Sequence, residues 1–211
     1  EFVAQAAAGG ATSLLVERVQ DVALPQLVVE DSLVAMGAIG AGVRNGFAHP
    51  VVGITGSCGK TSTKEMLRVL LGETCTHATA GNWNNRIGVP MTLFGLNATR
   101  HDFAVIEAGI NQPEEMAALG AMIEADLTII TNIASAHLEL LGSLERVAAE
   151  KAELVLRSRA GAPVVLPSSV FQYEAFAACA ERARVLAGEG ESVSPAPKRV
   201  IRYHLNVSGA G

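Results

Sequence analysis

The sequence predicts an α/β fold in which helices flank a mostly parallel sheet, and two observations predict it. From residue 51 onward, short apolar segments alternate with amphipathic helical segments, a pattern typical of parallel strands buried on both faces. The first apolar segment, residues 51–55, runs directly into a glycine-rich loop, and Gly59-Lys60-Thr61 then opens a helix. This order of strand, glycine loop and helix is that of a phosphate-binding loop.

Each element after that loop follows from composition and spacing. Strands are expected where apolar residues run nearly without interruption or alternate with polar ones, at 51–55, 103–108, 127–132, 164–166 and 199–207. Helices are expected where apolar residues recur at helical spacing, at 61–71, 113–123, 143–156 and 173–186. The stripe expected to be buried on the first of these helices comprises Met66, Leu67, Leu70 and Leu71.

The residues before the loop are expected to form part of a small α/β domain. A helix over 2–8, strands over 13–16 and 26–29, and a helix over 33–44 capped by Asp31-Ser32 are expected. Turn residues at 45–46 and 49–50 place a boundary there, which divides the chain into residues 1–46 and 47–211. Because the chain lacks an initiator methionine and stops within a pattern, we expect a fragment whose second domain is incomplete at its C-terminal end.

Composition and charge narrow the class of protein. Hydrophobic residues make up 49% of the 211, enough for the core of one α/β domain and part of another. The net charge of −5, without a dense Lys/Arg block, argues against a nucleic-acid-binding surface. Without a basic signal sequence or a bilayer-length apolar run, we expect a cytoplasmic protein that does not insert into membranes. Cysteines at 58, 75 and 179 lack metal-ligand spacing, and their odd number fits a reducing compartment.

Residues 55–62, here called the phosphate loop, have the chemistry of a nucleotide site. Glycines let the backbone turn tightly and direct N–H groups at a phosphate, and the helix N-terminus adds a partial positive charge. Lys60 supplies a mobile cation and Thr61 a hydroxyl for Mg²⁺. Ile54 departs from the usual pattern, which has a glycine at that position. The residues expected to contact the phosphates are Thr55, Gly56, Ser57, Cys58, Gly59, Lys60, Thr61 and Ser62.

Polar residues follow two of the expected strands, at the edge where parallel sheets bind ligands. Glu107 closes an apolar strand, and a carboxylate there is either solvated at the strand edge or meets a cation such as Mg²⁺. His137 lies in the loop after the strand at 127–132, where it is either incidental or part of a site. Both residues are therefore candidates for the site beside the phosphate loop.

Lys151 lies on a helical face that is otherwise apolar. Its neighbours at helical spacing are Leu144, Val147, Ala148, Leu154 and Val155. A lysine in such surroundings must extend its amine to solvent, pair with an acid or lose its proton. The sequence leaves open whether Lys151 extends to solvent or serves the site.

A loop at residues 81–90, here called the asparagine-rich loop, places Asn82, Asn84 and Asn85 between glycines and a proline. Its composition alone is typical of a turn. Three amides and Arg86 in one loop could equally hold the polar groups of a substrate. Both interpretations stay open at this point.

Taken together, these segments resemble the central domain of the Mur ligases. The resemblance covers residues 50–156 and is carried, in chain order, by TGSCGKT, GNWNNRIGVP, IEAGIN, TNIASAHLE and EKAE. The shortened phosphate loop of that family also accounts for Ile54. The asparagine-rich loop resembles most the branch that joins D-alanyl-D-alanine to a UDP-N-acetylmuramoyl-tripeptide. Residues 1–46 resemble the second half of the domain that binds the UDP substrate.

The resemblance implies an ATP-dependent, Mg²⁺-using ligase of peptidoglycan precursor synthesis. In this family the γ-phosphoryl group of ATP passes to the peptide carboxylate of the UDP-N-acetylmuramoyl substrate, which gives an acyl phosphate. The amine of D-alanyl-D-alanine then attacks the acyl phosphate, and phosphate leaves. A cytoplasmic monomer is implied. Because the C-terminal domain that binds the incoming amine is missing from the expected fragment, we expect no ligation by the fragment alone.

The resemblance also implies a role for each candidate residue. Lys60 holds the β- and γ-phosphates, and Thr61 with Glu107 binds one Mg²⁺. Glu107, His137 and Lys151 serve a second Mg²⁺, with Lys151 carbamylated so that a cation becomes an oxygen-donor anion. Lys60, His137 and Lys151 are therefore the implied catalytic residues. The residues implied to face the phosphoryl group or the substrate carboxylate are Asn82, Asn84 and Asn85.

Other functions remain open at this stage. The ligase that adds the third peptide residue, cyanophycin synthetase and folylpolyglutamate synthase share the implied site. A nucleotide-binding module that switches or hydrolyses without ligation needs only the strand and the phosphate loop. Such a module gives no role to His137 or Lys151, so two bound Mg²⁺ ions and a modified lysine would exclude it.

Overall fold

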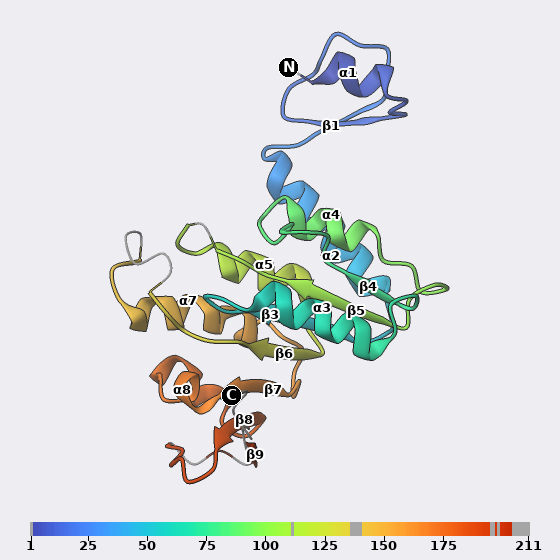
Figure 1. Ribbon diagram of the computed structural model, residues 1–211. Helices are drawn as coiled ribbons and strands as arrows, with labels where there is room; N and C mark the ends of the chain where they lie inside the picture. The colour runs from blue at the N-terminus through green and yellow to red at the C-terminus, as the bar shows by residue number, and fades with distance from the viewer. Residues whose placement is uncertain (1, 111, 136–140, 195–196, 198, 204–211) are drawn as a thin grey trace, which may run out of the picture.

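The computed structural model describes residues 2–110, 112–135, 141–194, 197 and 199–203. Within this part of the chain, a seven-stranded sheet in the order β4-β5-β3-β6-β7-β8-β9 forms the centre of the molecule (Figure 1). Its strands are β3 (Val51–Thr55), β4 (Thr76–Ala78), β5 (Phe103–Glu107), β6 (Leu127–Ile130), β7 (Val164–Pro167), β8 (Ala183–Gly188) and β9 (Arg199–Tyr203). The pairings between these neighbours are parallel, which confirms the expected fold class.

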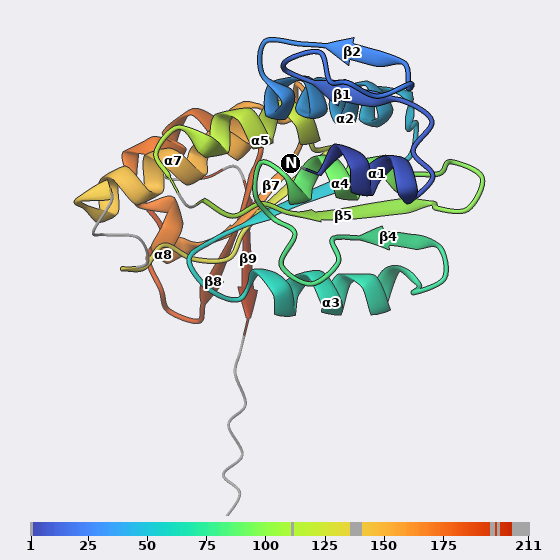
Figure 2. The same ribbon diagram turned by 90° about the horizontal axis from the view of Figure 1, so that it is seen from above.

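Helices cover both faces of this sheet (Figure 2). On one face lies α3 (Lys60–Leu71), and on the other lie α2 (Ser32–Gly46), α4 (Gly88–Phe94), α5 (Glu115–Ile123) and α7 (Leu144–Leu156). Alternating side chains of β3 serve the two layers. Val51 joins the large core that includes residues of α4, α5 and α7, whereas Val52 and Ile54 pack beneath α3.

The buried face of α3 differs from the expectation. Leu67 and Leu71 pack against the sheet as predicted. Met66 and Leu70, which were expected in the same stripe, are 66% and 80% exposed. The reason is that the inward face of the helix also contains Lys64, which is fully buried, and this turns Met66 and Leu70 toward solvent.

The prediction of a helix over residues 173–186 is wrong. The segment begins as a short 3-10 helix, η1 (Glu174–Cys179), and then becomes β8. Ala183, Val185 and Ala187 are buried while the residues between them are only partly so, which is the period of a strand. Alanine-rich composition favours a helix, but pairing with β7 along this segment outweighs that preference.

Three short elements after the phosphate loop were not predicted, and one prediction is only partly covered. Neither β4 nor α4 nor α8 (Ser168–Phe171) was expected, because each is too short to show a period. Residues 199–203 form the predicted last strand as β9. The rest of that prediction, residues 204–207, lies outside the described residues.

The N-terminal residues form a small unit at one end of the molecule (Figure 1). It contains α1 (Val3–Ala8) and a parallel pair of strands, β1 (Leu14–Val16) and β2 (Gln26–Val28). Helix α2 begins at the predicted cap Asp31 but packs against α4 and α5 of the larger unit. Residues of α2, which lie before the expected boundary at residues 46 and 47, thus pack with the larger unit. None of the helices in the described residues has the length and hydropathy needed to cross a bilayer.

Candidate active site

Three strand ends meet beside the phosphate loop. Strand β3 pairs with β5 on one side and β6 on the other, so that Ile54 lies next to Glu107 and Thr55 next to Ile130. Because these strands run in the same direction, the phosphate loop, the end of β5 and the segment after β6 share one edge of the sheet (Figure 2). Glu107 is the last residue of β5. This is the edge at which open parallel sheets bind ligands.

Close contacts with the segment after β6 shape the phosphate loop. At Gly56, whose φ is +152°, a Cβ would lie 1.8 Å from Thr131 Oγ1, so a larger residue would clash. The same hydroxyl donates to the Cys58 carbonyl at 2.6 Å. Ile54 is fully buried beneath α3 as a strand residue, so a glycine is not needed there. The turn of the loop thus begins after Thr55, which explains the departure in glycine spacing.

Asn132 also holds the phosphate loop, and the sequence analysis gave it no role. Its Oδ1 accepts the N–H groups of Ser57 and Cys58, each at 2.9 Å. Its Nδ2 donates to Cys58 Sγ at 2.7 Å. The available signal was its position directly after a buried parallel strand. The side-chain amide of Asn132, two residues after the end of β6, therefore fixes the backbone of the phosphate loop.

The start of α3 meets the buried carboxylate of Glu107. Thr61 Oγ1 donates to Glu107 Oε2 at 2.9 Å, and Asn84 Nδ2 donates to Glu107 Oε1 at 2.7 Å. Glu107 is only 1% exposed, which excludes the solvated strand-edge interpretation. Lys60 Nζ donates to the Gly56 carbonyl at 2.9 Å, so its ammonium lies over the phosphate loop.

The donor set at Glu107 fits Mg²⁺. A carboxylate and a hydroxyl are oxygen ligands of the type that this ion prefers, and Mg²⁺ commonly completes its shell with phosphate oxygens and water. Thr61 Oγ1 and Glu107 Oε2 are already within hydrogen-bond distance, so one cation could contact both oxygens. The described residues contain no group of three or more His, Cys, Asp or Glu side chains placed to bind a metal.

The asparagines of the asparagine-rich loop have different surroundings. Asn84 is bonded to Glu107, as described above. Asn85 Oδ1 accepts two backbone N–H groups at the start of α4, at 3.1 and 2.9 Å, and so caps that helix. Asn82 is exposed and, with Trp83, lines a hollow of about 440 Å³. Asn82 is thus the most exposed of the three, and Asn85 lines the same hollow.

Lys151 is buried, as its apolar helical face indicated. Its side chain does not extend to solvent, because the residue is only 1% exposed. Burial, followed by the positive charge of Lys60, lowers the pKa of Lys151 from 10.5 to about 8, and the negative charge of Glu150 opposes this shift. The ammonium groups of Lys151 and Lys60 are therefore near enough to interact. The structure therefore brings Lys151 to the same site as Lys60.

His137 lies outside the described residues, within the gap at 136–140. Its assignment to the site stays a prediction. The described residues before the gap follow β6 and include Asn132. Those after the gap lead into α7, the helix that carries Lys151.

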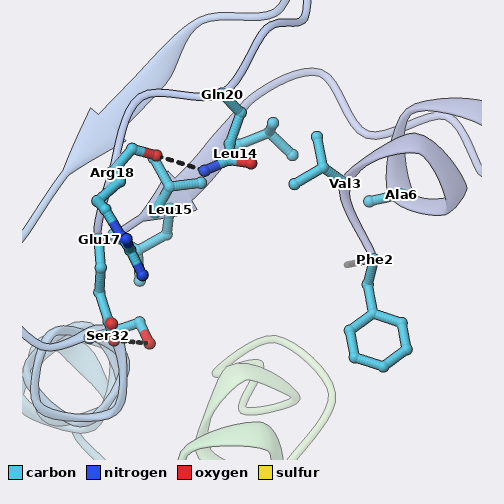
Figure 3. Close-up of a pocket in the computed structure, with 10 residues that line it drawn as sticks. Phe2, Val3, Ala6, Leu14, Leu15, Glu17, Arg18, Gln20 and Ser32 are labelled. Carbon is cyan, nitrogen blue, oxygen red and sulfur yellow. Dashed lines mark hydrogen bonds between the residues drawn. The ribbon is translucent and has the colours of Figure 1, made fainter.

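A second hollow lies in the N-terminal unit, away from the phosphate loop (Figure 3). Its volume is about 470 Å³, and residues of α1, β1 and the start of α2 line it. On one wall Glu17 Oε1 accepts the N–H and the hydroxyl of Ser32, at 3.0 and 2.8 Å, and Gln20 donates to the Arg18 carbonyl. On the opposite wall, Val3 and Ala6 present small apolar side chains.

Comparison with known protein families identifies the domain that carries this site. Residues 54–190 match the family model of the Mur ligase middle domain. The chain belongs to this family. The match contains the whole of β4, β5, β6, β7 and β8 and the last two residues of β3. It includes Glu107, Asn132 and Lys151.

Two curated relatives of this Mur ligase middle domain carry the same name. The UDP-N-acetylmuramoyl-tripeptide--D-alanyl-D-alanine ligase of Escherichia coli K12 is 47% identical over 156 residues, which are 73% of this chain and 34% of that protein. The protein of the same name from Synechocystis is 39% identical over 158 residues, 73% of this chain and 35% of that protein. The chain thus spans about a third of the length of these relatives.

Solved structures agree with the family assignment. MurF from Acinetobacter baumannii superimposes with a TM-score of 0.81 at 35% identity, covering 89% of this chain and 42% of that one. MurF from Thermotoga maritima in complex with ADP gives 0.77 at 27% identity, covering 88% of this chain and 44% of that one. FolC from Escherichia coli, in complex with DHPP and ADP, gives 0.55 at 17% identity over 85% of this chain and 51% of that one, and shares the fold alone.

Proposed function

We propose that this Mur ligase middle domain binds ATP and Mg²⁺ within a ligase that joins D-alanyl-D-alanine to UDP-N-acetylmuramoyl-tripeptide. The observation that carries the proposal is the buried carboxylate of Glu107, whose two oxygens meet Thr61 and Asn84 directly beside the phosphate loop. The names of the two curated relatives support the choice of UDP-N-acetylmuramoyl-tripeptide and D-alanyl-D-alanine as substrates. The ADP complex of the Thermotoga MurF supports the choice of nucleotide.

The chemistry required is phosphoryl transfer between two anions, which depends on positioning and charge neutralisation more than on covalent catalysis. Loop N–H groups and the Lys60 ammonium hold the β- and γ-phosphates of ATP. Thr61 and Glu107 would hold Mg²⁺, which would neutralise charge on the transferred group. A carboxylate oxygen of the tripeptide bonds to the γ-phosphorus, and the bond from that phosphorus to ADP breaks. The D-alanyl-D-alanine amine then bonds to the acyl carbon, phosphate leaves, and the amine loses a proton.

Lys151 is proposed to be carbamylated. Its neutral amine attacks carbon dioxide, a nitrogen–carbon bond forms, one proton is released, and the former cation becomes an oxygen-donor anion. Burial and the lowered pKa of about 8 support this step, because they raise the fraction of neutral amine near neutral pH. With Glu107 and His137, the carbamate would serve a second Mg²⁺.

The remaining assignments concern the substrates and the setting of the protein. Asn82, Asn84 and Asn85 are proposed to face the tripeptide carboxylate or the phosphoryl group, and the exposure of Asn82 supports a direct contact. Residues 1–46 are assigned to the domain that binds the UDP substrate and residues 47–211 to the ATP-binding domain. The protein is proposed to act as a cytoplasmic monomer.

The test is a ligation assay on the protein that contains this chain as its central domain. With ATP, Mg²⁺, UDP-N-acetylmuramoyl-tripeptide and D-alanyl-D-alanine, one ADP and one phosphate should be released per UDP-N-acetylmuramoyl-pentapeptide formed. Without D-alanyl-D-alanine, hydroxylamine should trap the acyl phosphate as a hydroxamate. Lys60→Ala should lower turnover by about 100-fold or more, because charge stabilisation of the phosphoryl group is lost.

Two further outcomes of the assay decide between interpretations. Lys151→Ala should abolish ligation, and added bicarbonate should not restore it, since alanine cannot be carbamylated. Unchanged ligation in that variant would contradict the role of Lys151. Release of ADP and phosphate with no pentapeptide would instead favour a module that hydrolyses nucleotide without ligation.

A further inference from the structure

Lys64 is a fully buried lysine outside the residues assigned above. It lies one turn after Thr61 on α3, on the helix face that packs toward the sheet. Removing an ammonium group from water is costly unless oxygen acceptors surround it. The partners of Lys64 therefore indicate what this position does.

Those partners are main-chain carbonyls of one short segment. Lys64 Nζ donates to the Thr79 carbonyl at 2.7 Å and to the Gly81 carbonyl at 3.2 Å. Thr79 directly follows β4, and Gly81 is the first residue of the asparagine-rich loop. The ammonium also pairs with Glu65 at 3.0 Å, but the Glu65 side chain is 48% exposed, so this ion pair contributes little. The carbonyl contacts thus fasten the start of the loop to α3.

The fastened segment also holds Glu107. Thr79 Oγ1 accepts the backbone N–H of Glu107 at 2.9 Å. Further along the asparagine-rich loop, Asn84 donates to one oxygen of the same carboxylate, while Thr61 donates to the other. The contacts close a ring that runs from α3 through Lys64 to the loop, on to Glu107, and back to α3 through Thr61.

We propose that Lys64 is a positioning residue that fixes the asparagine-rich loop against α3, so that Glu107 and Asn84 are held in place for a Mg²⁺–nucleotide complex. The inference rests on the proposed function, because it concerns the same nucleotide site. The ammonium of Lys64 donates to the carbonyls of Thr79 and Gly81, so its effect on the site passes through that segment.

The test uses the whole chain and ADP as the probe, with affinity measured in excess EDTA and again in saturating Mg²⁺. The ratio of the two affinities reports how well Thr61 and Glu107 support metal-linked binding. Lys64→Met keeps the apolar stem and removes the ammonium. Loss of a group that orients a metal ligand costs about 10- to 100-fold in metal affinity, so the ratio should fall by at least about 10-fold. The affinity of Lys64→Met for ADP in EDTA should stay within about twofold of that of the unmodified chain, because the substitution and the metal-free contacts of ADP act independently.

Glu65→Gln is the matched control, because it removes the ion pair and leaves both carbonyl contacts of Lys64. The ratio of its ADP affinities in Mg²⁺ and in EDTA should equal that of the unmodified chain. If Lys64→Met fails to fold, as judged by lost ADP binding in EDTA, Thr79→Val decides instead. That variant removes the hydroxyl that accepts the Glu107 N–H while keeping the carbonyl that Lys64 binds, and its ratio should also fall.

An unchanged ratio in Lys64→Met, or in Thr79→Val where Lys64→Met is unfolded, would overturn the inference. An equal loss in Glu65→Gln would overturn it too, since the ion pair would then be the decisive contact. Absence of ADP binding by the unmodified chain under both conditions would be a different failure. It would contradict the proposed function, and the role of Lys64 with it.

Discussion

Lys151 shows how burial alone prepares a side chain for chemistry. The residue is 1% exposed, and desolvation of its ammonium lowers its pKa to about 8. The folded protein therefore binds this proton less tightly than the unfolded chain does. Below a pH of about 8 the buried charge destabilises the fold. The penalty disappears as the pH rises toward 10.5, where the unfolded chain also loses the proton.

Lys151→Met should accordingly stabilise the chain below pH 8 in buffer depleted of carbon dioxide. Methionine keeps the apolar stem and removes the charge, so the gain in the free energy of unfolding should approach about 3 kcal/mol. The gain should shrink steadily as the pH rises from 8 toward 10.5. Urea denaturation across this pH range measures it. Arg146→Met, at an exposed position of the same helix, should show a small difference that does not vary with pH. A gain for Lys151→Met that is constant with pH would contradict the account.

The two buried lysines of the site differ in how well the sequence indicates them. Lys151 could be recognised because its helical neighbours are all apolar, which is a local property of the sequence. Lys64 could not, because its acceptors are carbonyls in a segment that the fold, not the local sequence, brings to it. Asn132 was missed for the same reason, since its partners belong to the phosphate loop.

The asparagine-rich loop depends on close packing against the start of α4. A Cβ at Gly88 would lie 2.3 Å from the Trp83 carbonyl carbon and 2.4 Å from its Cα. The obstruction is backbone, so it cannot be relieved by rotating a side chain. Glycine at this position therefore lets the loop fold back over α4, which places Asn84 beside Glu107.

Gly88→Ala should destabilise the chain by about 3 kcal/mol, because the added methyl forces the loop backbone to move. The chain has one tryptophan, Trp83, so its fluorescence emission should report the same movement. Gly42→Ala is the matched control, since a Cβ there meets nothing within 4 Å. That change in α2 should stabilise the chain by about 0.5 to 1 kcal/mol. Equal stability and unchanged emission for Gly88→Ala would show that the loop is not held in this way.

Elements with a clear period were predictable, whereas β4, α4, α8 and the strand within residues 173–186 were not. The helix at 143–156 was confirmed as α7, with Ser143 as its cap, because its apolar spacing and capping residue agree. The segment at 173–186 was assigned to a helix from the spacing of its apolar residues. Its strand half is stabilised by pairing with β7, a contact that local propensity does not record.

At the scale of the whole molecule, Arg44 joins the N-terminal part of the chain to the large sheet. It is fully buried, and its guanidinium donates to the carbonyls of Phe47, Ile123 and Glu124 and to Asp126. Asp126 also accepts the N–H of Val51 at 2.8 Å. This network fixes α2 to the start of β3 and β6, which explains why α2 packs with the sheet.

The order of motifs predicted which edge of the sheet carries the phosphate loop and Glu107, whereas it did not show which unit α2 packs with. Parallel strands bring their carboxyl ends to one edge, so Glu107 and the phosphate loop were expected at the same edge of the sheet. The pairing of β3 with β5 makes them neighbours. The turn residues at 45–50 are present but lie within the packed unit. Contacts such as those of Arg44, not turn composition, decide where one unit ends.

The central claim is that residues 55–62 form a working nucleotide site completed by Glu107. It is tested most directly by calorimetric titration of ADP, in saturating Mg²⁺, into the unmodified chain and into Lys60→Ala. The account predicts saturable one-to-one binding to the unmodified chain. It predicts binding at least about 100-fold weaker in the variant, because the cation over the phosphates is lost. Equal affinity for the two proteins, or no binding to the unmodified chain, would contradict the claim.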